Sequence, residues 1–320
     1  MKKLYLITGA SGHLGINLIQ ALLQKDCDIR VFCLPKDKKH FPSSIQVITG
    51  DIRDNEALRP FFDITNYEEV TLIHAAAKIS ILSKKDPTVW DINVNGTKNV
   101  MELALNTHLT RVLYISSIHA IKEQPLPTII KETKTFSKED VIGQYAKSKA
   151  EAARIVLEYA DKGLPVSILH PTGIIGPGDL NHTNNSVSTI IAIRKGLFPF
   201  PIQGGYDFVD VRDVVDGILK CEETGRVGEC YILSGTYLTI QRLFELVKEK
   251  KEPFVFPSKI AKVFAPLMEK GSLRLGIKQP LITPYSLYTL QTNAHFSHEK
   301  ATKEFNYQTR DIKETIKDSK

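Results

Sequence analysis

The chain has 320 residues, of which 42% are hydrophobic and 24% are charged, and its formal net charge is +6 at pH 7. This composition is typical of a globular protein with a sizeable core, and it excludes disordered and fibrous chains. The basic excess is mild. Because the one dense basic run (Lys36, Lys38, Lys39 and His40) is short, we expect no nucleic-acid partner.

The cysteines and the apolar stretches indicate the cellular compartment of the protein and whether it binds a metal or a membrane. The spacing of Cys27, Cys33, Cys221 and Cys230 does not match a metal site, so we expect no bound metal. Few cysteines and no secretory signal favour a cytoplasmic protein. The most apolar late stretch, Pro253–Leu267, is interrupted by proline and lysine, so we expect no membrane partner.

Short apolar runs alternate with segments of helical period up to Pro171. This alternation predicts an α/β fold of the Rossmann type, with a doubly wound parallel sheet covered on both faces. The expected strands are Leu4–Thr8, Ile29–Leu34, Ile45–Ile48, Val70–His74, Val112–Ser116 and Val166–Leu169. The expected helices are Ile16–Leu23, Asn55–Phe62, Thr88–Asn106 and Gln144–Asp161.

The pattern is looser after Pro171. We expect a loop at Pro177–Ser188, one or two short strands within Gly204–Arg212, and helices at Asp213–Glu223 and Ile240–Lys250. We expect residues 1–180 to form a dinucleotide-binding domain. Residues 181–320 are expected to form a smaller, mixed, mainly substrate-binding part that packs on it and returns some strands or helices to it.

A glycine-rich turn lies between the first strand and the first helix. It comprises Thr8, Gly9, Ala10, Ser11, Gly12, His13, Leu14 and Gly15. Free N–H groups at a helix N-terminus attract a pyrophosphate, and glycines allow it to approach the backbone closely. The spacing is G-x-x-G-x-x-G, and a plain glycine turn is the alternative. Its place between a strand and a helix favours a dinucleotide site.

The end of the second strand bears on which dinucleotide is bound. An acidic residue there usually contacts a ribose 2′-hydroxyl, but no acid occurs here before Asp37. The nearby lysines, Lys36 and Lys38 among them, favour a 2′-phosphate and hence NADP. Alternatively these lysines form a solvated loop, which leaves NAD open.

Tyr145 and Lys149 are one helical turn apart, so they share a helix face. An ammonium close to a phenol stabilises the phenolate, which lets the tyrosine exchange a proton with a carbonyl or an alcohol. About one such spacing is expected by chance among eleven tyrosines, so the location decides. Ser116 and Ser117 end the fifth strand, where parallel sheets bind ligands, although they could also be turn residues.

Together these residues resemble the extended short-chain dehydrogenase/reductase family, also called the NAD-dependent epimerase/dehydratase family. The resemblance covers most of the chain and is strongest to dihydroflavonol-4-reductase-like and 3β-hydroxysteroid-dehydrogenase-like members. It is based on Thr8–Gly15, Gly50–Asp54, His74–Ala77, Asn93–Thr97, Tyr145 with Lys149, His170–Gly178 and Phe208–Asp213.

The resemblance implies a role for each matched residue. It implies that Asp51 and Ile52 lie at the adenine, and that Lys149 also bonds the nicotinamide ribose. Four residues are implied as catalytic: Ser117, Tyr145, Lys149 and Asn93. The segments beside the cofactor are implied to be Ala75, Ala76 and Ala77, Ser116, and Pro171, Thr172, Gly173 and Ile174. Such members usually carry Arg for NADP about where Leu34 stands.

The substrate is expected in the C-terminal part. Candidate pocket or core residues are Phe198, Phe200, Phe254, Phe256, Phe264, Met268 and Tyr285. No arginine cluster suits a nucleotide diphosphate, and Arg274 is isolated. We therefore expect reduction of an aldehyde or ketone, or oxidation of an alcohol. The alternatives are a nucleotide-sugar epimerase or dehydratase with NAD, and a non-enzymatic NADP sensor.

A homodimer is also expected from the resemblance. Family members often pair two helices of each subunit into a four-helix bundle, here Asn93–Asn106 and Tyr145–Asp161. Val100 and Leu103 are expected to face outward and to serve this contact.

Overall fold

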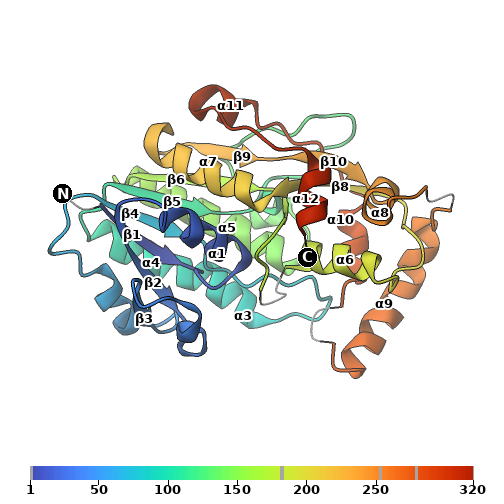
Figure 1. Cartoon of the computed structure of the whole chain (residues 1–320), viewed down its shortest axis with the longest axis horizontal. Helices are drawn as coiled ribbons and strands as arrows, with labels where there is room; N and C mark the ends of the chain where they lie inside the picture. The colour runs from blue at the N-terminus through green and yellow to red at the C-terminus, as the bar shows by residue number, and fades with distance from the viewer. Residues whose placement is uncertain (1–2, 181–183, 252–253, 278–279, 320) are drawn as a thin grey trace.

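The large sheet organises the molecule (Figure 1). The computed structural model describes residues 3–180, 184–251, 254–277 and 280–319. Seven parallel strands form the sheet in the order β3-β2-β1-β4-β5-β6-β9. Their bounds are β1 Lys3–Thr8, β2 Cys27–Cys33, β3 Gln46–Thr49, β4 Val70–His74, β5 Arg111–Ile115, β6 Val166–Pro171 and β9 Cys230–Leu233. This confirms the predicted Rossmann-type α/β fold.

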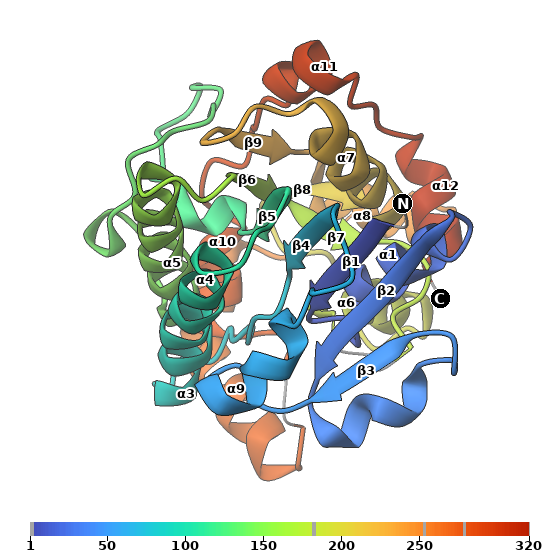
Figure 2. The same ribbon diagram turned by 90° about the vertical axis from the view of Figure 1, so that its left-hand side faces the viewer.

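The strands are apolar because helices cover both faces of the sheet (Figure 2). Along β1, Leu4 and Leu6 belong to one buried cluster, and Tyr5 and Ile7 belong to the other. The first cluster packs under α2 (Asn55–Leu58), α4 (Thr97–Leu105) and α5 (Gln144–Asp161). The second packs under α1 (His13–Leu22), α7 (Val211–Thr224) and α11 (Glu299–Phe305).

The strand order reverses direction next to β1. The chain runs from β1 to β2 and β3 on one side, then crosses to β4 on the other side. The backbone N–H of Ala75 donates to the Thr8 carbonyl at 3.2 Å, so the loops after β1 and β4 begin together and then separate. Such a reversal opens a crevice at the carboxyl ends of the strands.

A smaller sheet stands at this edge. It has the order β10-β8-β7, where β7 is Gly173–Ile175, β8 is Gly205–Asp210 and β10 is Thr236–Thr239. The small sheet packs against helices α6 (Asn185–Arg194), α8 (Ile240–Lys248) and α12 (Ile312–Asp318), and together they form one apolar core. Helices α9 (Ser258–Arg274) and α10 (Pro284–Thr289) pack against each other at the periphery.

Short helical turns complete the described chain. They are η1 Pro35–His40, η2 Arg59–Phe62, α3 Pro87–Trp90, η3 Asp91–Gly96, η4 Ile118–Ala120 and η5 Lys138–Asp140. The helix predicted at Thr88–Asn106 is therefore α3, η3 and α4 in succession, with a π-helical turn at η3. Within the described ranges, no helix is long and apolar enough to cross a membrane.

Two predictions of local structure were wrong, and one helix was missed. The loop expected at Pro177–Ser188 ends early, because α6 begins at Asn185; residues 181–183 of that loop lie outside the described part. Helix α9 was not predicted, since Pro266 stands inside it. Val100 was expected to face outward, but it is fully buried in the core beneath α4, and Leu103 packs partly against the same core.

Candidate active site

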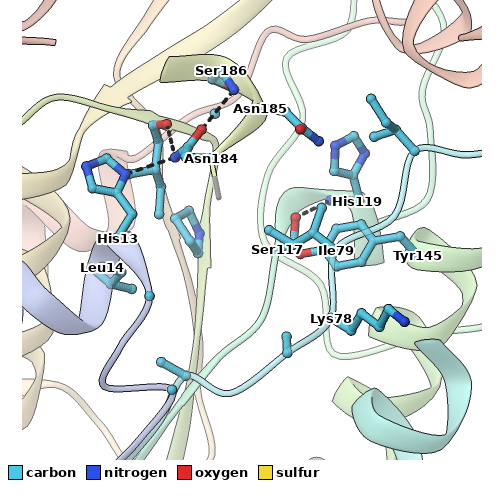
Figure 3. A pocket seen from close by; sticks show the side chains of 18 of the residues that line it. His13, Leu14, Lys78, Ile79, Ser117, His119, Tyr145, Asn184, Asn185 and Ser186 are labelled. Atoms are coloured by element: carbon cyan, nitrogen blue, oxygen red, sulfur yellow. Dashed lines mark hydrogen bonds between the residues drawn. The ribbon is translucent and has the colours of Figure 1, made fainter. Parts of the chain in front are cut away.

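A cavity of about 1210 Å³ occupies the crevice between the two sheets. Its wall begins at the glycine turn after β1, passes the ends of β4, β5 and β6, and reaches α6, α8 and α10. Figure 3 shows two groups of side chains facing each other across it, with His13 and Asn184 on one side and Ser117 and Tyr145 on the other. Most of the residues predicted to bind cofactor or to act in catalysis line this one cavity.

The three glycines of the turn differ in whether the protein itself leaves room for a side chain. Gly9 has φ +73°, and a Cβ there would lie 2.6 Å from the Ala75 carbonyl carbon. A Cβ on Gly15 would lie 2.3 Å from the Gly9 carbonyl oxygen. At Gly12 the nearest atom would be 3.4 Å away, an ordinary contact. The protein itself therefore has room for a methyl group at Gly12, and the same space is open to a ligand that approaches from the cavity.

Gly12 is also the N-cap of α1, and no side chain caps that helix. The first N–H groups of a helix have no partner within it and carry partial positive charge. Ser11, His13 and Leu14 line the cavity beside them. The turn is thus arranged to receive an anionic group such as a pyrophosphate.

His13 links the glycine turn to Pro177 and Asn184 through hydrogen bonds of its ring. Its Nε2 lies 2.8 Å from the Pro177 carbonyl, and its Nδ1 lies 2.9 Å from Asn184 Nδ2. Because a carbonyl accepts and an amide nitrogen donates, the ring is neutral with its proton on Nε2, and burial lowers its pKa. Asn184 also donates to the Ile174 carbonyl and caps α6 through Ser186 N. These bonds hold one wall of the cavity.

Several charged residues line the cavity where the chain leaves β2, at the same end as the glycine turn. Lys36, Asp37 and Lys39 line it, whereas Lys38 does not. Ser11 Oγ donates to Asp37 Oδ2 at 3.1 Å. Asp51 and Ile52 follow β3 and line the same end; Asp51 pairs with Arg53 at 2.7 Å, and these hydrogen bonds lower its pKa.

Tyr145 and Lys149 project from the first turns of α5 and are both buried. Lys149 Nζ donates to the Ile115 carbonyl at 2.8 Å and to Tyr114 Oη at 3.3 Å. Burial lowers the pKa of Lys149 to about 7. Burial raises the pKa of Tyr145 to about 12, although a hydrogen bond with Ser117 lowers it in part. The tyrosine is therefore protonated at neutral pH.

Ser117 follows β5 and is held by its own turn. Its Oγ accepts from the His119 backbone N–H at 3.2 Å, which fixes the hydroxyl beside Tyr145 (Figure 3). Ser116, Ala75, Ala76 and Ala77 line the neighbouring wall, as do Pro171, Thr172, Gly173 and Ile174.

Three predicted site residues lie outside the cavity wall: Lys38, Asn93 and Thr8. Asn93 Oδ1 accepts from Lys78 N at 2.7 Å, and its Nδ2 donates to the Lys78 carbonyl and to Ser148 Oγ. Thr8 Oγ1 contacts His74 Nδ1 at 2.6 Å and accepts from Ala76 N. Asn93 joins the π-helical turn to α5, and Thr8 joins β1 to β4, so both position residues that line the cavity.

The other end of the cavity, beyond Tyr145, is aromatic and aliphatic. Its residues include Ile79, Phe198, Phe200, Ile202, Tyr206, Phe208, Leu243, Phe244, Ile282, Tyr285 and Leu290. His119 Nε2 lies 2.7 Å from Tyr206 Oη, and its ring stands edge-on to Tyr145 at 6.0 Å. Lys78 at the margin is paired with Asp86 at 2.7 Å.

Part of the sequence-based assignment for this end was wrong. Phe198, Phe200 and Tyr285 line the cavity. Phe254, Phe264 and Met268 do not line the cavity, and because they are exposed they do not belong to the core either. Phe256 packs partly against the small cluster beneath α9. Arg274, the isolated candidate for a diphosphate, is exposed at the end of α9 and does not line the cavity.

Comparison with known proteins decides the family. Residues 5–233 match the sequence profile described as the NAD dependent epimerase/dehydratase family. The chain belongs to this family. It is 31% identical over 246 residues to sterol demethylase protein B of Methylococcus capsulatus, which covers 76% of this chain and 73% of the relative.

Other members match the whole length of the chain. The human short-chain dehydrogenase/reductase family 42E member 1 is 27% identical over 355 aligned residues, which cover 98% of this chain and 86% of the relative. The solved structure of gox2253 superposes with a TM-score of 0.82 at 29% identity and covers 99% of this chain and 97% of that one. The expected resemblance to the extended short-chain dehydrogenase/reductases is thereby confirmed.

The cavity fits the NAD-type dinucleotide of the epimerase/dehydratase family. Gly12 leaves space at a helix N-terminus for a pyrophosphate, and Asp51 and Ile52, which line the same end of the cavity, would contact the adenine. The segments 75–77 and 171–174 would face the nicotinamide end, next to Ser117, Tyr145 and Lys149. The residues present therefore suit the group.

Sequence reasoning missed several polar residues of this site, among them His119, Tyr206 and Asn184. His119 is two positions after Ser117, which is the only local signal that could have suggested it. Tyr206 and Asn184 reach the cavity from segments far away in the sequence, and no local pattern distinguishes them. The expected contributions of Ser11 and His13 also include contacts to Asp37 and Asn184 that sequence could not show.

Gly12→Ala tests the assignment of the turn. We expect the unfolding free energy of this variant to be lower than that of the wild type by no more than about 1 kcal/mol, since the protein has room for the methyl group. We expect cofactor affinity to weaken at least about tenfold, because the methyl group occupies the path of the pyrophosphate. Thermal unfolding and NAD(P)H fluorescence titration measure the two effects. Gly271→Ala, where a Cβ meets nothing within 4 Å, is the matched control; equal cofactor affinity in both variants would contradict the assignment.

Lys149→Met tests the effect of burial on the lysine. The folded-state pKa of about 7 lies below the unfolded value, so between the two values only the unfolded chain holds the extra proton. Wild-type stability therefore gains from a pH rise across this window, and the variant lacks this gain. Relative to the variant, we expect the unfolding free energy of the wild type to rise by at least about 1 kcal/mol between pH 7 and pH 10. Denaturant unfolding measures it, and a pH-independent difference would refute the shift.

Proposed function

We propose that this protein is an NADP-preferring reductase that converts a carbonyl group of a bulky, uncharged, apolar substrate to an alcohol, with Tyr145 as the proton donor. One observation carries the proposal: the group formed by Ser117, Tyr145 and Lys149 lies between a dinucleotide turn and an apolar pocket end. A substrate in that end can present one oxygen to Tyr145 while its body contacts aromatic and aliphatic side chains.

The protonation state of Tyr145 supports reduction. When bound, the nicotinamide supplies or accepts a hydride. With its pKa raised to about 12, the Tyr145 phenol carries its proton at neutral pH and can donate it to a carbonyl oxygen that gains negative charge. Ser117 Oγ lies beside the phenol and can donate a second hydrogen bond to that oxygen.

Lys149 supports the same proton transfer through its charge. In its charged form, the ammonium stabilises the phenolate that remains after the proton has left Tyr145. Its anchor to the Ile115 carbonyl holds it below the tyrosine on the same helix face. The reverse reaction, oxidation of an alcohol, uses the same residues with the proton moving the other way, and becomes easier at alkaline pH.

The apolar end argues against the two alternatives. A nucleotide-sugar epimerase or dehydratase needs cations for a diphosphate, whereas the charged residues that line the described cavity are at the turn end, apart from Lys149 and the paired Lys78. A non-enzymatic NADP sensor needs no proton donor, whereas Tyr145 and Lys149 are both placed in the cavity wall. Bound NAD that survives dialysis of the purified protein would favour the epimerase.

Tyr145→Phe tests the proton donor. We expect kcat for carbonyl reduction to fall at least about 100-fold, because the phenol that donates the proton is removed. The dissociation constant for NADPH should change less than about twofold, since the phenyl ring keeps its place. Turnover is followed by NADPH absorbance with a panel of aromatic and alicyclic ketones and aldehydes. The control is Tyr159→Phe, on the same helix but within the core; similar activity in both variants would refute the role.

The cofactor preference is tested at the lysines after β2. Lys36 and Lys39 line the cavity, and Asp37 between them is bound by Ser11. We expect the double variant Lys36→Ala/Lys39→Ala to bind NADPH at least about tenfold more weakly with NADH affinity nearly unchanged, because only the 2′-phosphate interacts with these charges. Lys38→Ala, outside the cavity wall, should change neither. Tighter binding of NADH than NADPH by the wild type would reverse the proposed preference.

A further inference from the structure

Helix α9 presents its large apolar residues outward. Its buried stripe consists of Ser258, Ala261, Ala265 and Glu269, all of which are small except the last. Ile260, Val263, Phe264, Leu267 and Met268 follow the i, i+3, i+4, i+7, i+8 spacing of one helix face, and all five are exposed. Val263 is 73% exposed and Leu267 is 69% exposed. A helix that only packed against the core would have the opposite arrangement.

This exposed face lies at an edge of the molecule. Figures 1 and 2 both show α9 at the periphery, next to α10. The apolar surface continues past the end of the helix, where Leu275 is 82% exposed. Patches of adjacent exposed apolar residues on a water-soluble surface mark a site of interaction.

The exposed charges of α9 are all positive. They are Lys259, Lys262, Lys270 and Arg274. Within Ser258–Arg274 the single carboxylate, Glu269, is buried, and it accepts from Ser83 N at 2.8 Å and from Ser83 Oγ at 2.7 Å. Among the ion pairs of the described residues, none involves these four cations. The helix therefore combines an open apolar face with an unneutralised cationic flank.

The apolar face is connected to the cavity. Phe200 lines the cavity and is itself exposed at its margin. Its ring meets that of Phe254 edge-on at 5.1 Å, and Phe254 is exposed shortly before the start of α9. Apolar surface thus extends from the substrate end of the cavity through these two rings toward α9.

We propose that α9 docks on the surface of a membrane that contains anionic phospholipids. The five apolar side chains would enter the boundary between headgroups and acyl chains, and the four cations would lie level with the anionic headgroups. The sequence-based expectation of no membrane partner concerned a spanning segment. Surface docking needs only one apolar helix face, and it places the apolar end of the cavity near the lipid.

Charge separates this partner from a second copy of the chain. In a two-fold contact centred on α9, each α9 would meet the α9 of its partner, so the cations of both copies would gather at one contact. That arrangement is repulsive, whereas an anionic lipid surface is complementary to the same residues. The proposal does not depend on the reaction assigned to the cavity.

Vesicle co-sedimentation of the full chain tests the proposal. We expect binding to vesicles of phosphatidylglycerol and phosphatidylcholine, and at least about tenfold weaker binding to phosphatidylcholine alone. Val263→Ser/Leu267→Ser should weaken binding to the anionic vesicles at least about tenfold, because two apolar side chains no longer enter the lipid. Lys259→Gln/Lys262→Gln should weaken it by a similar factor and reduce its salt dependence.

Controls distinguish docking from loss of structure and from self-association. Ile129→Ser/Val227→Ser removes two exposed apolar residues outside α9 and should bind vesicles like the wild type. All variants should unfold at the wild-type temperature, since the substituted side chains are exposed. Equal vesicle binding by wild type and Val263→Ser/Leu267→Ser would overturn the proposal. A wild-type dimer that becomes a monomer in that variant, without lipid binding, would also overturn it and identify the face as a contact between copies.

Discussion

The contact between the glycine turn and the loop after β4 is the constraint on which the site depends. Gly9 adopts a positive φ and lies so close to Ala75 that any side chain would collide with the backbone there. Gly15 lies against the Gly9 carbonyl in the same way. These approaches bring the N-terminus of α1 and the end of β4 to one edge of the sheet, and the cavity opens between them.

Burial sets the protonation of the proposed catalytic group. Lys149 and Tyr145 are both removed from water, so the neutral form of each is favoured. The Tyr145 phenol therefore keeps its proton near neutral pH, where Lys149 is close to its titration point. Such an arrangement costs stability in the absence of ligand, as is common where function and folding make opposite demands.

The two ends of the cavity differ in chemistry because they come from different parts of the fold. The turn end is built from the carboxyl ends of parallel strands, where backbone N–H groups and lysines suit an anion. The apolar end is built from α6, α8, α10 and the small sheet, which contribute aromatic and aliphatic side chains. His13 and Asn184 link the two ends, so the glycine turn and the N-terminus of α6 share one hydrogen-bonded wall. The exposed face of α9 lies beyond the apolar end.

The sequence by itself determined the features that depend on local pattern. The strands at β1 and β4 were predictable because both faces of a central parallel strand are buried, which leaves a continuous apolar run. The glycine turn and the Tyr145–Lys149 spacing are likewise local, since a turn and a helical repeat each involve neighbouring residues.

Only the tertiary structure decided which surfaces those elements bury and which distant groups meet. Val100 and Phe264 are both apolar residues on helices, yet one is in the core and the other faces outward, because burial depends on what packs against each helix. Asn93 bonds Lys78 and Ser148 outside the cavity wall, while Tyr206 and Asn184 enter the cavity from afar. Contacts between segments remote in sequence leave no periodic signal, and for that reason they had to be seen in the fold.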